Sequence, residues 1–292
     1  MNPAAALLAA VEIGDPLTRG SLALFPLFHE RPPTGAYLSG PRAHEHLHIA
    51  ELAEGATVPE LEVANGWPVA VLLLDGETLL GAQQNRILTT SVLVPAAATT
   101  RVSVTCVEAG RWGGDERPVA RSGRHAPSAV RARNLASVTR SVVEGGCVQP
   151  DQAGVWNEID RYLTAARTDS PTRALEDVPT DHVHEIVGGT TPLAGQCGVA
   201  AAVGGRVVAV DLFDDPRTLA DYWDALVAGY TLDAKRTPTK HPRRRDVRRV
   251  LANVAAGRAT SHGGRVHIDA GNAAATAVVL DDIVVHLVCT NV

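Results

Sequence analysis

The chain has 292 residues, of which 45% are hydrophobic and 20% are charged, and its formal net charge is −5. This composition excludes a generally disordered chain, and the negative balance excludes a surface that is basic throughout. The apolar run at 4–11 is short and follows no basic residue, and no later run approaches the length of a membrane span. We therefore expect a cytoplasmic protein without membrane contact, long enough for one large or two smaller domains.

Cysteine spacing and local charge narrow the possible partners further. Cys106, Cys147, Cys197 and Cys289 form no CxxC pair, which argues against a disulfide framework or a thiolate zinc site and fits a reducing compartment. Residues 235–249 hold eight Lys or Arg against one Asp. This segment has no interleaved aromatic residues, so a solvated helix face is preferred over contact with RNA or phosphate, and nucleic acid is disfavoured as a partner.

Between residues 22 and 107, short apolar runs are separated by clusters of Gly, Pro, Asn or Thr, which predicts a β-rich region. The predicted strands include residues 47–52, 69–74, 77–80, 91–94 and 101–107. Asp75-Gly76 favours a two-residue hairpin between the second and third of these runs, and another hairpin is expected between the last two. Residues 110–125 are rich in Gly and Arg without periodicity, which predicts a long surface loop.

Helical periodicity follows the β-rich region. Apolar side chains recur at three- and four-residue intervals over 128–144 and 152–166, which predicts two helices. Farther on, Gly204-Gly205 predicts a hairpin, the apolar stripe over 219–230 predicts a helix, and Pro242 marks where another helix can start. The last predicted strands are 265–268, 275–280 and 283–288, with a turn at Asp281-Asp282 between the final two.

Together these elements predict an α+β fold in three parts. Residues 1–126 form a β-rich N-terminal half, sandwich- or barrel-like, that carries the candidate site; 127–170 form a helical connector; and 171–292 form a smaller α/β C-terminal half. One composite domain made of all three parts is the alternative. No GxGxxG, GxxxxGK[ST], GxSxG or HExxH motif supports the common dinucleotide, P-loop, hydrolase or zincin sites, and the sequence names no cofactor and no oligomeric state.

The densest polar chemistry lies between residues 75 and 112. Its side chains combine carboxylates, amides, guanidinium groups and an indole: Glu77, Gln84, Asn85, Arg86, Glu108, Arg111 and Trp112. Arginine forks bind carboxylate or phosphate, carboxylates act as general bases or accept from ribose hydroxyls, and an indole stacks on a flat ring. The competing interpretation is structural: Asp75-Gly76 forms a turn, and the polar side chains satisfy loop backbone groups.

Two segments of this region resemble one protein family. LLLDGETLLGAQQNR at 72–86 and VSVTCVEAGRW at 102–112 are similar to the domain found beside ADP-ribosylglycohydrolase and rhodanese-phosphatase domains. The resemblance covers most of the chain, through LFPLF at 24–28, Glu51, Val58-Pro59, LEVAN at 61–65 and, more loosely, 195–213. It implies a link to NAD and ADP-ribose metabolism, because of the family's neighbouring domains, and no established reaction.

From these residues and this resemblance we expect an anionic small-molecule ligand, ADP-ribose-like or another phosphorylated nucleotide. Glu77 and Glu108 are the candidate catalytic carboxylates of a hydrolase or transferase. The candidate ligand-binding residues are Glu51, Gln84, Asn85, Arg86, Arg111 and Trp112. A non-catalytic ligand sensor or interaction module is the alternative, so whether the protein is an enzyme stays open.

A third hypothesis is a cupin-like metal-dependent enzyme. His44, His46 and His48 would share one face of a strand, and Glu51 could complete a metal-binding set. The position of Glu51 and the flanking glycines miss the usual cupin signature, so no metal is favoured. His182-Val-His184 is a second pattern of the same kind.

The sharpest geometric expectation concerns Arg86. Gly81-Ala82 ends a strand with little side-chain bulk, and the 101–107 strand delivers Glu108 where the Gly-rich segment begins. We therefore expect Arg86 to point into a cleft shared with Glu108 and Arg111 rather than into bulk solvent.

Overall fold

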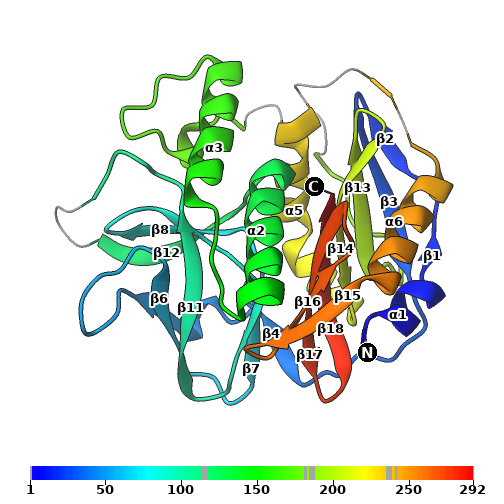
Figure 1. Cartoon of the computed structure of the whole chain (residues 1–292), viewed down its shortest axis with the longest axis horizontal. Coiled ribbons are helices and arrows are strands. Elements are labelled where there is room, and N and C mark those ends of the chain that lie inside the picture. Colours follow the sequence, from blue (N-terminus) through cyan, green and yellow to red (C-terminus); the bar gives the residue numbers. More distant parts are fainter. Residues whose placement is uncertain are drawn as a thin grey trace.

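The computed structural model describes residues 2–112, 117–180, 183, 188–234, 239–240 and 242–291. Its largest sheet joins strands from both ends of the chain (Figure 1). The strands are β1 (Glu12–Ile13), β2 (Leu17–Arg19), β3 (Leu22–Phe28), β13 (Gly198–Val203), β14 (Arg206–Phe213), β15 (Arg258–His262), β16 (Arg265–Asp269), β17 (Ala273–Leu280) and β18 (Ile283–Asn291). They pair antiparallel in the order β1-β3-β13-β14-β18-β17-β16-β15, and β2 pairs with β3.

Both faces of this sheet are buried. In β3, Ala23, Phe25 and Leu27 belong to the core beneath α1 (Ala5–Ala10) and α6 (Arg244–Ala256). The alternate residues Leu22 and Leu24 belong to the core beneath α5 (Pro216–Ala234). Because neighbouring side chains on a strand point to opposite faces, a strand covered on both sides reads as a continuous apolar run, which is what LALFPLF is.

A second β-rich region is built from residues 37–125. One of its sheets contains β5 (Leu47–Ala50), β6 (Glu60–Asn65), β8 (Glu77–Ala82), β9 (Arg86–Leu88), β11 (Ala98–Cys106) and β12 (Arg117–His125), in the order β12-β8-β9-β11-β6-β5. The other contains β4 (Tyr37–Ser39), β7 (Ala70–Leu73) and β10 (Val92–Val94), in the order β10-β7-β4. Alternate residues of β6 and β11 share one apolar core with β7 and β10, so the two sheets enclose it.

Helices α2 (Ser128–Gly145) and α3 (Gln152–Ala166) follow, as the periodicity predicts. Gly146, with φ +70°, ends α2, and the Asp151 side chain caps α3 by accepting the Gly154 N–H at 2.8 Å. Figure 1 shows α2 between the two β-rich regions. Leu135 of α2 packs on Val288 of β18, so this helix helps to join the regions.

The broad prediction of a β-rich α+β fold is confirmed. The structure adds that strands from the N-terminal and C-terminal parts of the chain pair in one sheet. Strand β3, within the predicted 1–126 part, pairs with β13 of the predicted 171–292 part. The C-terminal sheet is antiparallel, so its α/β description holds only in the sense of mixed helices and strands. The division into parts stays a prediction, and the shared sheet favours one composite domain. Among the described residues, no helix has the length and apolarity to cross a membrane.

Two of the predicted hairpins are wrong. Asp75-Gly76 does form a turn, with Gly76 at φ +80°, but it leads from β7 in one sheet to β8 in the other. The Gly76 N–H bonds to Leu88 O at 2.7 Å, so the turn is tied to β9 rather than to a β7–β8 ladder. Likewise β10 pairs with β7 while β11 pairs with β6 and β9, because Ala97, at φ +49°, redirects the chain between them. The hairpins at Gly204-Gly205 and Asp281-Asp282 are confirmed.

The surface loop predicted at 110–125 is wrong over its second half. Strand β12 pairs with β8 from Arg117 to His125, with register shifts on either side of the Ala120–Arg121 pairs. Gly123, at φ +73°, lies in the second irregular stretch. These interruptions remove the regular alternation by which a strand is recognised in sequence.

A substitution at Gly229 of α5 tests how closely this helix approaches the end of β12. A Cβ at this position would lie 2.9 Å from Ala126 O and 3.0 Å from His125 O, which are backbone atoms with little freedom to move. Alanine gains about 1 kcal/mol in helix propensity, but overpacking costs about 1–3 kcal/mol. We expect Gly229→Ala to lower the free energy of unfolding measured with urea.

Gly145→Ala is the matched control, because a Cβ there meets nothing closer than Cys147 Sγ at 3.9 Å. This variant should be as stable as the wild type or slightly more stable. A Gly229→Ala protein that matched Gly145→Ala in stability would show that the helix has room to shift.

Candidate functional site

The connection between β8 and β9 is a tight loop held by side chains from the segment that follows β11. Gly81 and Ala82 both have positive φ angles, +111° and +49°. Arg111 donates from Nη1 to Ala82 O at 2.9 Å and from Nη2 to Gly81 O at 3.3 Å. Asn85 Oδ1 accepts from the Gly81 N–H and from Arg111 Nη2, both at 3.1 Å. Arg111 therefore fixes the backbone that delivers Arg86.

Glu108 completes this arrangement from the end of β11. Its Oε2 accepts from Arg111 Nε at 2.9 Å and from the Asn85 N–H at 3.0 Å, and its carbonyl accepts from Gln84 Nε2 at 3.0 Å. Burial alone would raise the pKa of Glu108, but the hydrogen bonds from Arg111 and the Asn85 N–H outweigh it and lower the pKa below its usual value. Glu108 is thus an ionised carboxylate with its lone pairs engaged.

Arg86 makes a separate, fully buried ion pair. Its Nη1 lies 3.0 Å from Glu51 Oε2, and Glu51 Oε1 accepts the Gln83 N–H at 3.1 Å. The Arg86 side chain has 0% of its surface exposed. Its Nε and Nη2 have no hydrogen-bond partner in the described part of the chain. A buried guanidinium with two unpaired nitrogens is an uncommon and costly arrangement.

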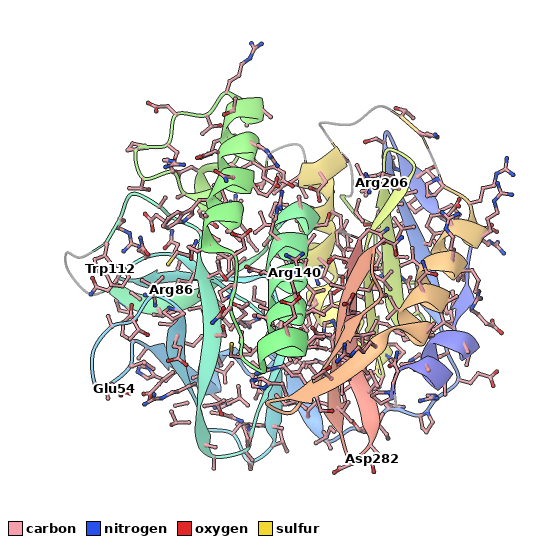
Figure 2. The ribbon with its side chains drawn as sticks, viewed as in Figure 1. Glu54, Arg86, Trp112, Arg140, Arg206 and Asp282 are labelled. Carbon is pink, nitrogen blue, oxygen red and sulfur yellow. The ribbon has the colours of Figure 1, made fainter. Side chains whose placement is uncertain are left out.

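The Trp112 indole lies against this guanidinium, and Figure 2 labels both residues in the same part of the molecule. The Arg86 Cζ lies 5.9 Å from the centroid of the indole, within the range of a cation–π contact. The indole itself is 52% exposed, which is unusual for so large an apolar ring. The Cys106 thiol lies beside Arg86; burial raises the pKa of Cys106, and the guanidinium offsets part of this rise.

We call this set the Arg86 cluster: Glu51, Gln84, Asn85, Arg86, Glu108, Arg111 and Trp112. The structure brings all of these sequence-predicted residues together. As expected, Arg86 does not point into bulk solvent. Its ion-pair partner, however, is Glu51, while Glu108 pairs with Arg111.

Two comparisons found nothing: no curated protein and no solved structure matches the chain. The sequence pattern of the ARG and Rhodanese-Phosphatase-superfamily-associated Protein domain, by contrast, matches residues 10–290. The chain belongs to this family. The match confirms the resemblance seen in the sequence and extends it across both β-rich regions of the fold, because it includes residues 37–125 as well as β18 of the large sheet.

In this family member, Glu77 lies apart from the Arg86 cluster, at the opposite end of β8. Its Oε1 accepts the Leu74 N–H at 2.7 Å, and its Oε2 accepts from Arg121 Nε at 2.7 Å. Both carboxylate oxygens therefore serve the turn and the β8–β12 pair. Glu77 and Glu108 therefore lie at different places in the fold, which does not support the prediction that they act together in one catalytic site.

The histidines lie differently from the expected strand. His44–His46 form a 3₁₀ turn, and β5 begins only at Leu47, so alternation along a strand does not bring the imidazoles to one face. His46 stacks on Trp67 with ring centroids 3.8 Å apart, and His48 is exposed. The His44 side chain, like His182 and His184, lies outside the described residues. Glu51, the fourth residue of the metal hypothesis, is the partner of Arg86.

Sequence reasoning missed a second buried charge cluster, located where α2 meets both β-rich regions. Arg131 Nε donates to Asp75 Oδ2 at 2.9 Å, and its Nη2 donates to Asp211 Oδ1 at 2.6 Å. Tyr230 donates to Asp211 as well, and His286 Nε2 lies 3.4 Å from the same carboxylate. Asp75, Asp211 and His286 are the set of described residues that could hold a metal ion, but the Arg131 guanidinium already bridges the two carboxylates.

This cluster had a signal in the sequence. Arg131 falls in line with Leu135, Val138 and Val142 at helical spacing, so it lies on the apolar face of α2. A charged residue in such a stripe requires a buried partner of opposite charge. Asp211, within the apolar run that follows Arg206 in strand β14, is one such partner.

Proposed function

We propose that the protein binds an anionic small molecule at the Arg86 cluster, of the ADP-ribose-like or phosphorylated-nucleotide class. The observation that carries the proposal is the buried Arg86 guanidinium, whose Nε and Nη2 have no hydrogen-bond partner among the described residues and whose Cζ lies over the half-exposed Trp112 indole. Each unsatisfied buried donor costs about 1–3 kcal/mol. A phosphate group would accept charge-assisted hydrogen bonds from both Arg86 Nε and Arg86 Nη2.

The indole suits the other end of such a ligand. Because Arg86 has no exposed surface, an anion reaches its guanidinium only after a neighbouring side chain moves, and Trp112, which lies over the guanidinium and is half exposed, is the candidate. The exposed face of the indole offers a flat surface on which a nucleobase can stack. The family's association with ADP-ribosylglycohydrolase and rhodanese-phosphatase domains supports this ligand class.

Binding has stronger support than catalysis. The two carboxylates predicted as catalytic are each held by an arginine, Glu77 by Arg121 and Glu108 by Arg111. We assign Glu108 a positioning role, in which it fixes Asn85 and Arg111 and so the loop that carries Arg86. A ligand sensor and a hydrolase or transferase share this binding site. A turnover assay on any ligand that binds separates the two.

The direct test is calorimetric titration of the full chain with ADP-ribose, NAD, ADP and a sugar phosphate. Arg86→Lys keeps the charge but removes the planar fork, so we expect ligand affinity to fall by at least about 1 kcal/mol, roughly fivefold. Trp112→Ala should weaken a nucleotide by about 1–3 kcal/mol through loss of stacking. Thermal unfolding of each variant, measured alongside, reports whether the fold is intact.

Arg101→Lys is the matched control, because Arg101 lies on β11 with 53% of its side chain exposed and should not affect binding. If none of the four ligands binds or raises the melting temperature, the nucleotide proposal is wrong. Equal affinity in the wild type and Arg86→Lys would show that the ligand binds elsewhere.

A further inference from the structure

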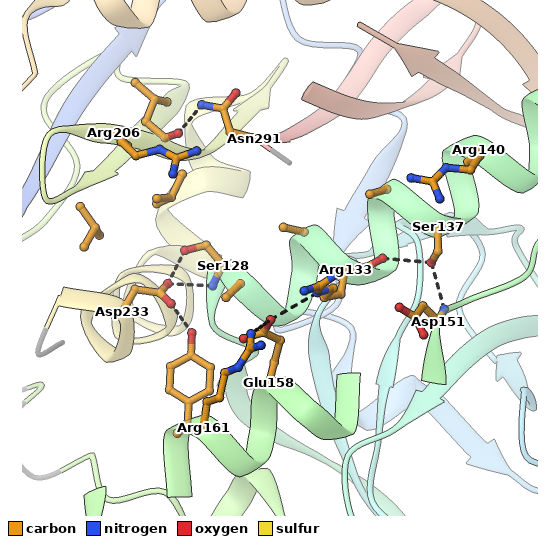
Figure 3. Close-up of a pocket in the computed structure, with 17 residues that line it drawn as sticks. Ser128, Arg133, Ser137, Arg140, Asp151, Glu158, Arg161, Arg206, Asp233 and Asn291 are labelled. Carbon is orange, nitrogen blue, oxygen red and sulfur yellow. Dashed lines mark hydrogen bonds and ion pairs between the residues drawn. The ribbon is translucent and has the colours of Figure 1, made fainter. Parts of the chain in front are cut away.

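A cavity of about 690 Å³ lies away from the Arg86 cluster, between α2 and α3 on one side and the β13–β14 hairpin on the other (Figure 3). Cavities that hold small molecules measure about 300–1,000 Å³. One face of α2 lines it, from Ser128 to Arg140. Because a helix rises about 1.5 Å per residue, these two positions are about 18 Å apart along the axis, so the cavity is elongated.

More arginine than carboxylate side chains line this cavity, and two of the arginines have no carboxylate partner among the described residues. Arg133 and Arg161 share one oxygen of Glu158, at 3.3 and 2.6 Å. The side chains of Arg140 and Arg206 have no hydrogen bond or ion pair with any described residue, and both residues are exposed. Figure 3 shows Arg206 beside Asn291 and Arg140 at the opposite side of the cavity. Unpaired positive charge therefore lies at both ends.

The remaining carboxylates of the cavity are engaged by their own neighbours. Asp151 caps α3 through the Gly154 N–H. Asp233 accepts from the Ser128 N–H at 2.9 Å and from the hydroxyl groups of Ser128 and Tyr162. Neither carboxylate forms an ion pair with Arg140 or Arg206, so both guanidinium groups can contact an anion, and four arginines against three carboxylates give the lining a net positive charge.

Between the two arginines, small apolar side chains form two facing walls of the cavity, while polar and charged side chains such as Ser128, Arg133 and Glu158 border the rest. Ala129, Ala132 and Ala136 follow one another along the same face of α2, and Val203 and Val208 lie across from them on the β13–β14 hairpin. Alanine leaves space beside the helix, and valine gives a dry opposite wall. These two facing walls suit the apolar or flat body of a ligand.

We propose that this cavity is a second ligand site, which binds an elongated small molecule carrying a phosphate or carboxylate group at each end. Arg140 holds one anionic group, and Arg206 holds the other. The apolar body of the ligand packs between the α2 alanines and the hairpin valines. The site is independent of the Arg86 cluster, with which it shares no residue.

The test uses matched probes titrated into the full chain: an unbranched bisphosphonate, the dicarboxylate of the same chain length, and the corresponding alkyl phosphonate with one anionic group. We expect the two-ended probes to bind with one-to-one stoichiometry and more tightly than the one-ended probe. The tighter of the two-ended probes identifies the anionic group. In an Arg140→Gln/Arg206→Gln protein its affinity should fall at least about tenfold, as expected when two charge-assisted contacts are lost.

Two further variants separate a built site from general attraction. Ala136→Trp fills the middle of the cavity without changing charge, and we expect it to abolish binding. Arg248→Gln removes an exposed charge on α6 outside the cavity and should bind like the wild type. The proposal is overturned if neither two-ended probe binds, if the one-ended probe binds equally well, or if Arg248→Gln loses as much affinity as the double variant. Arg86→Lys should leave this binding unchanged.

Discussion

Arg131→Met is expected to lower the free energy of unfolding by at least about 3–5 kcal/mol, the cost of removing one partner from a buried ion pair. The Arg131 guanidinium is fully buried and binds both Asp75 and Asp211, so its loss leaves two buried carboxylates without this counter-charge. The same guanidinium holds the pKa of Asp211 far below its usual value, against the effect of burial. Whole domains are stable by about 5–15 kcal/mol, so this variant lies near unfolding at room temperature.

The measurement is urea denaturation followed by near-ultraviolet circular dichroism. Arg131→Lys keeps the charge but cannot reach both carboxylates with paired donors, so its stability should lie between those of Arg131→Met and the wild type. The triple variant Arg131→Met/Asp75→Asn/Asp211→Asn keeps the test informative even when Arg131→Met is too unstable to measure.

Removing all three charges together should restore much of the lost stability, since neutral groups carry no uncompensated charge into the interior. A triple variant no more stable than Arg131→Met would show that packing, and not charge, is what Arg131 contributes. An Arg131→Met protein within about 1 kcal/mol of the wild type would contradict the ion-pair explanation altogether.

The position of Arg131 also shows what the sequence can and cannot reveal about this fold. Helix α2 is predicted because Val130, Leu135 and Val138 recur at helical spacing, and hairpins such as Gly204-Gly205 are predicted because turn and strands are adjacent in the chain. The turn at Asp75-Gly76 has the same local signal. Its flanking strands nevertheless enter different sheets, because distant partners and the Asp75–Arg131 ion pair decide their direction.

Pairing between residues far apart in the sequence also explains the other differences between the predictions and the structure. β3 lies beside β13, although most of the chain separates them, and no local pattern in LALFPLF names its neighbour. In the same way, the sequence identifies Arg86, Glu108 and Arg111 as a polar group without revealing their pairing. Which carboxylate meets which arginine depends on Glu51, delivered from a separate strand.

The protein is expected to lose stability in mild acid because the buried His125 imidazole becomes protonated more readily in the unfolded chain. This side chain is buried at the junction of β12 and α2, and burial, together with the positive charge of Arg131, lowers its pKa from 6.5 to about 4. His267 behaves in the same way: burial, with Arg265 nearby, lowers its pKa to about 4. Both imidazoles are therefore neutral in the folded protein at neutral pH.

The sign follows from the direction of these shifts. A folded pKa below the unfolded value means that the unfolded chain binds the proton more readily, so the stabilising contribution is complete above pH 6.5 and is lost as the pH falls toward 4. For His125 the shift corresponds to about 3 kcal/mol, since each pH unit is worth about 1.4 kcal/mol. The pKa of Asp211 is also lowered, but its contribution is lost only below its ordinary value of 3.8, outside this window.

Urea unfolding at a series of pH values between 7 and 4 measures this dependence. His125→Gln cannot take up the proton, so its unfolding free energy should change less steeply with pH than that of the wild type, and His267→Gln should have a similar effect. His48→Gln replaces an exposed imidazole and serves as the control, with the slope expected to stay unchanged. If His125→Gln keeps the full wild-type slope, the imidazole must be solvated or already charged in the fold, and β12 cannot be packed against α2 as tightly as its burial implies.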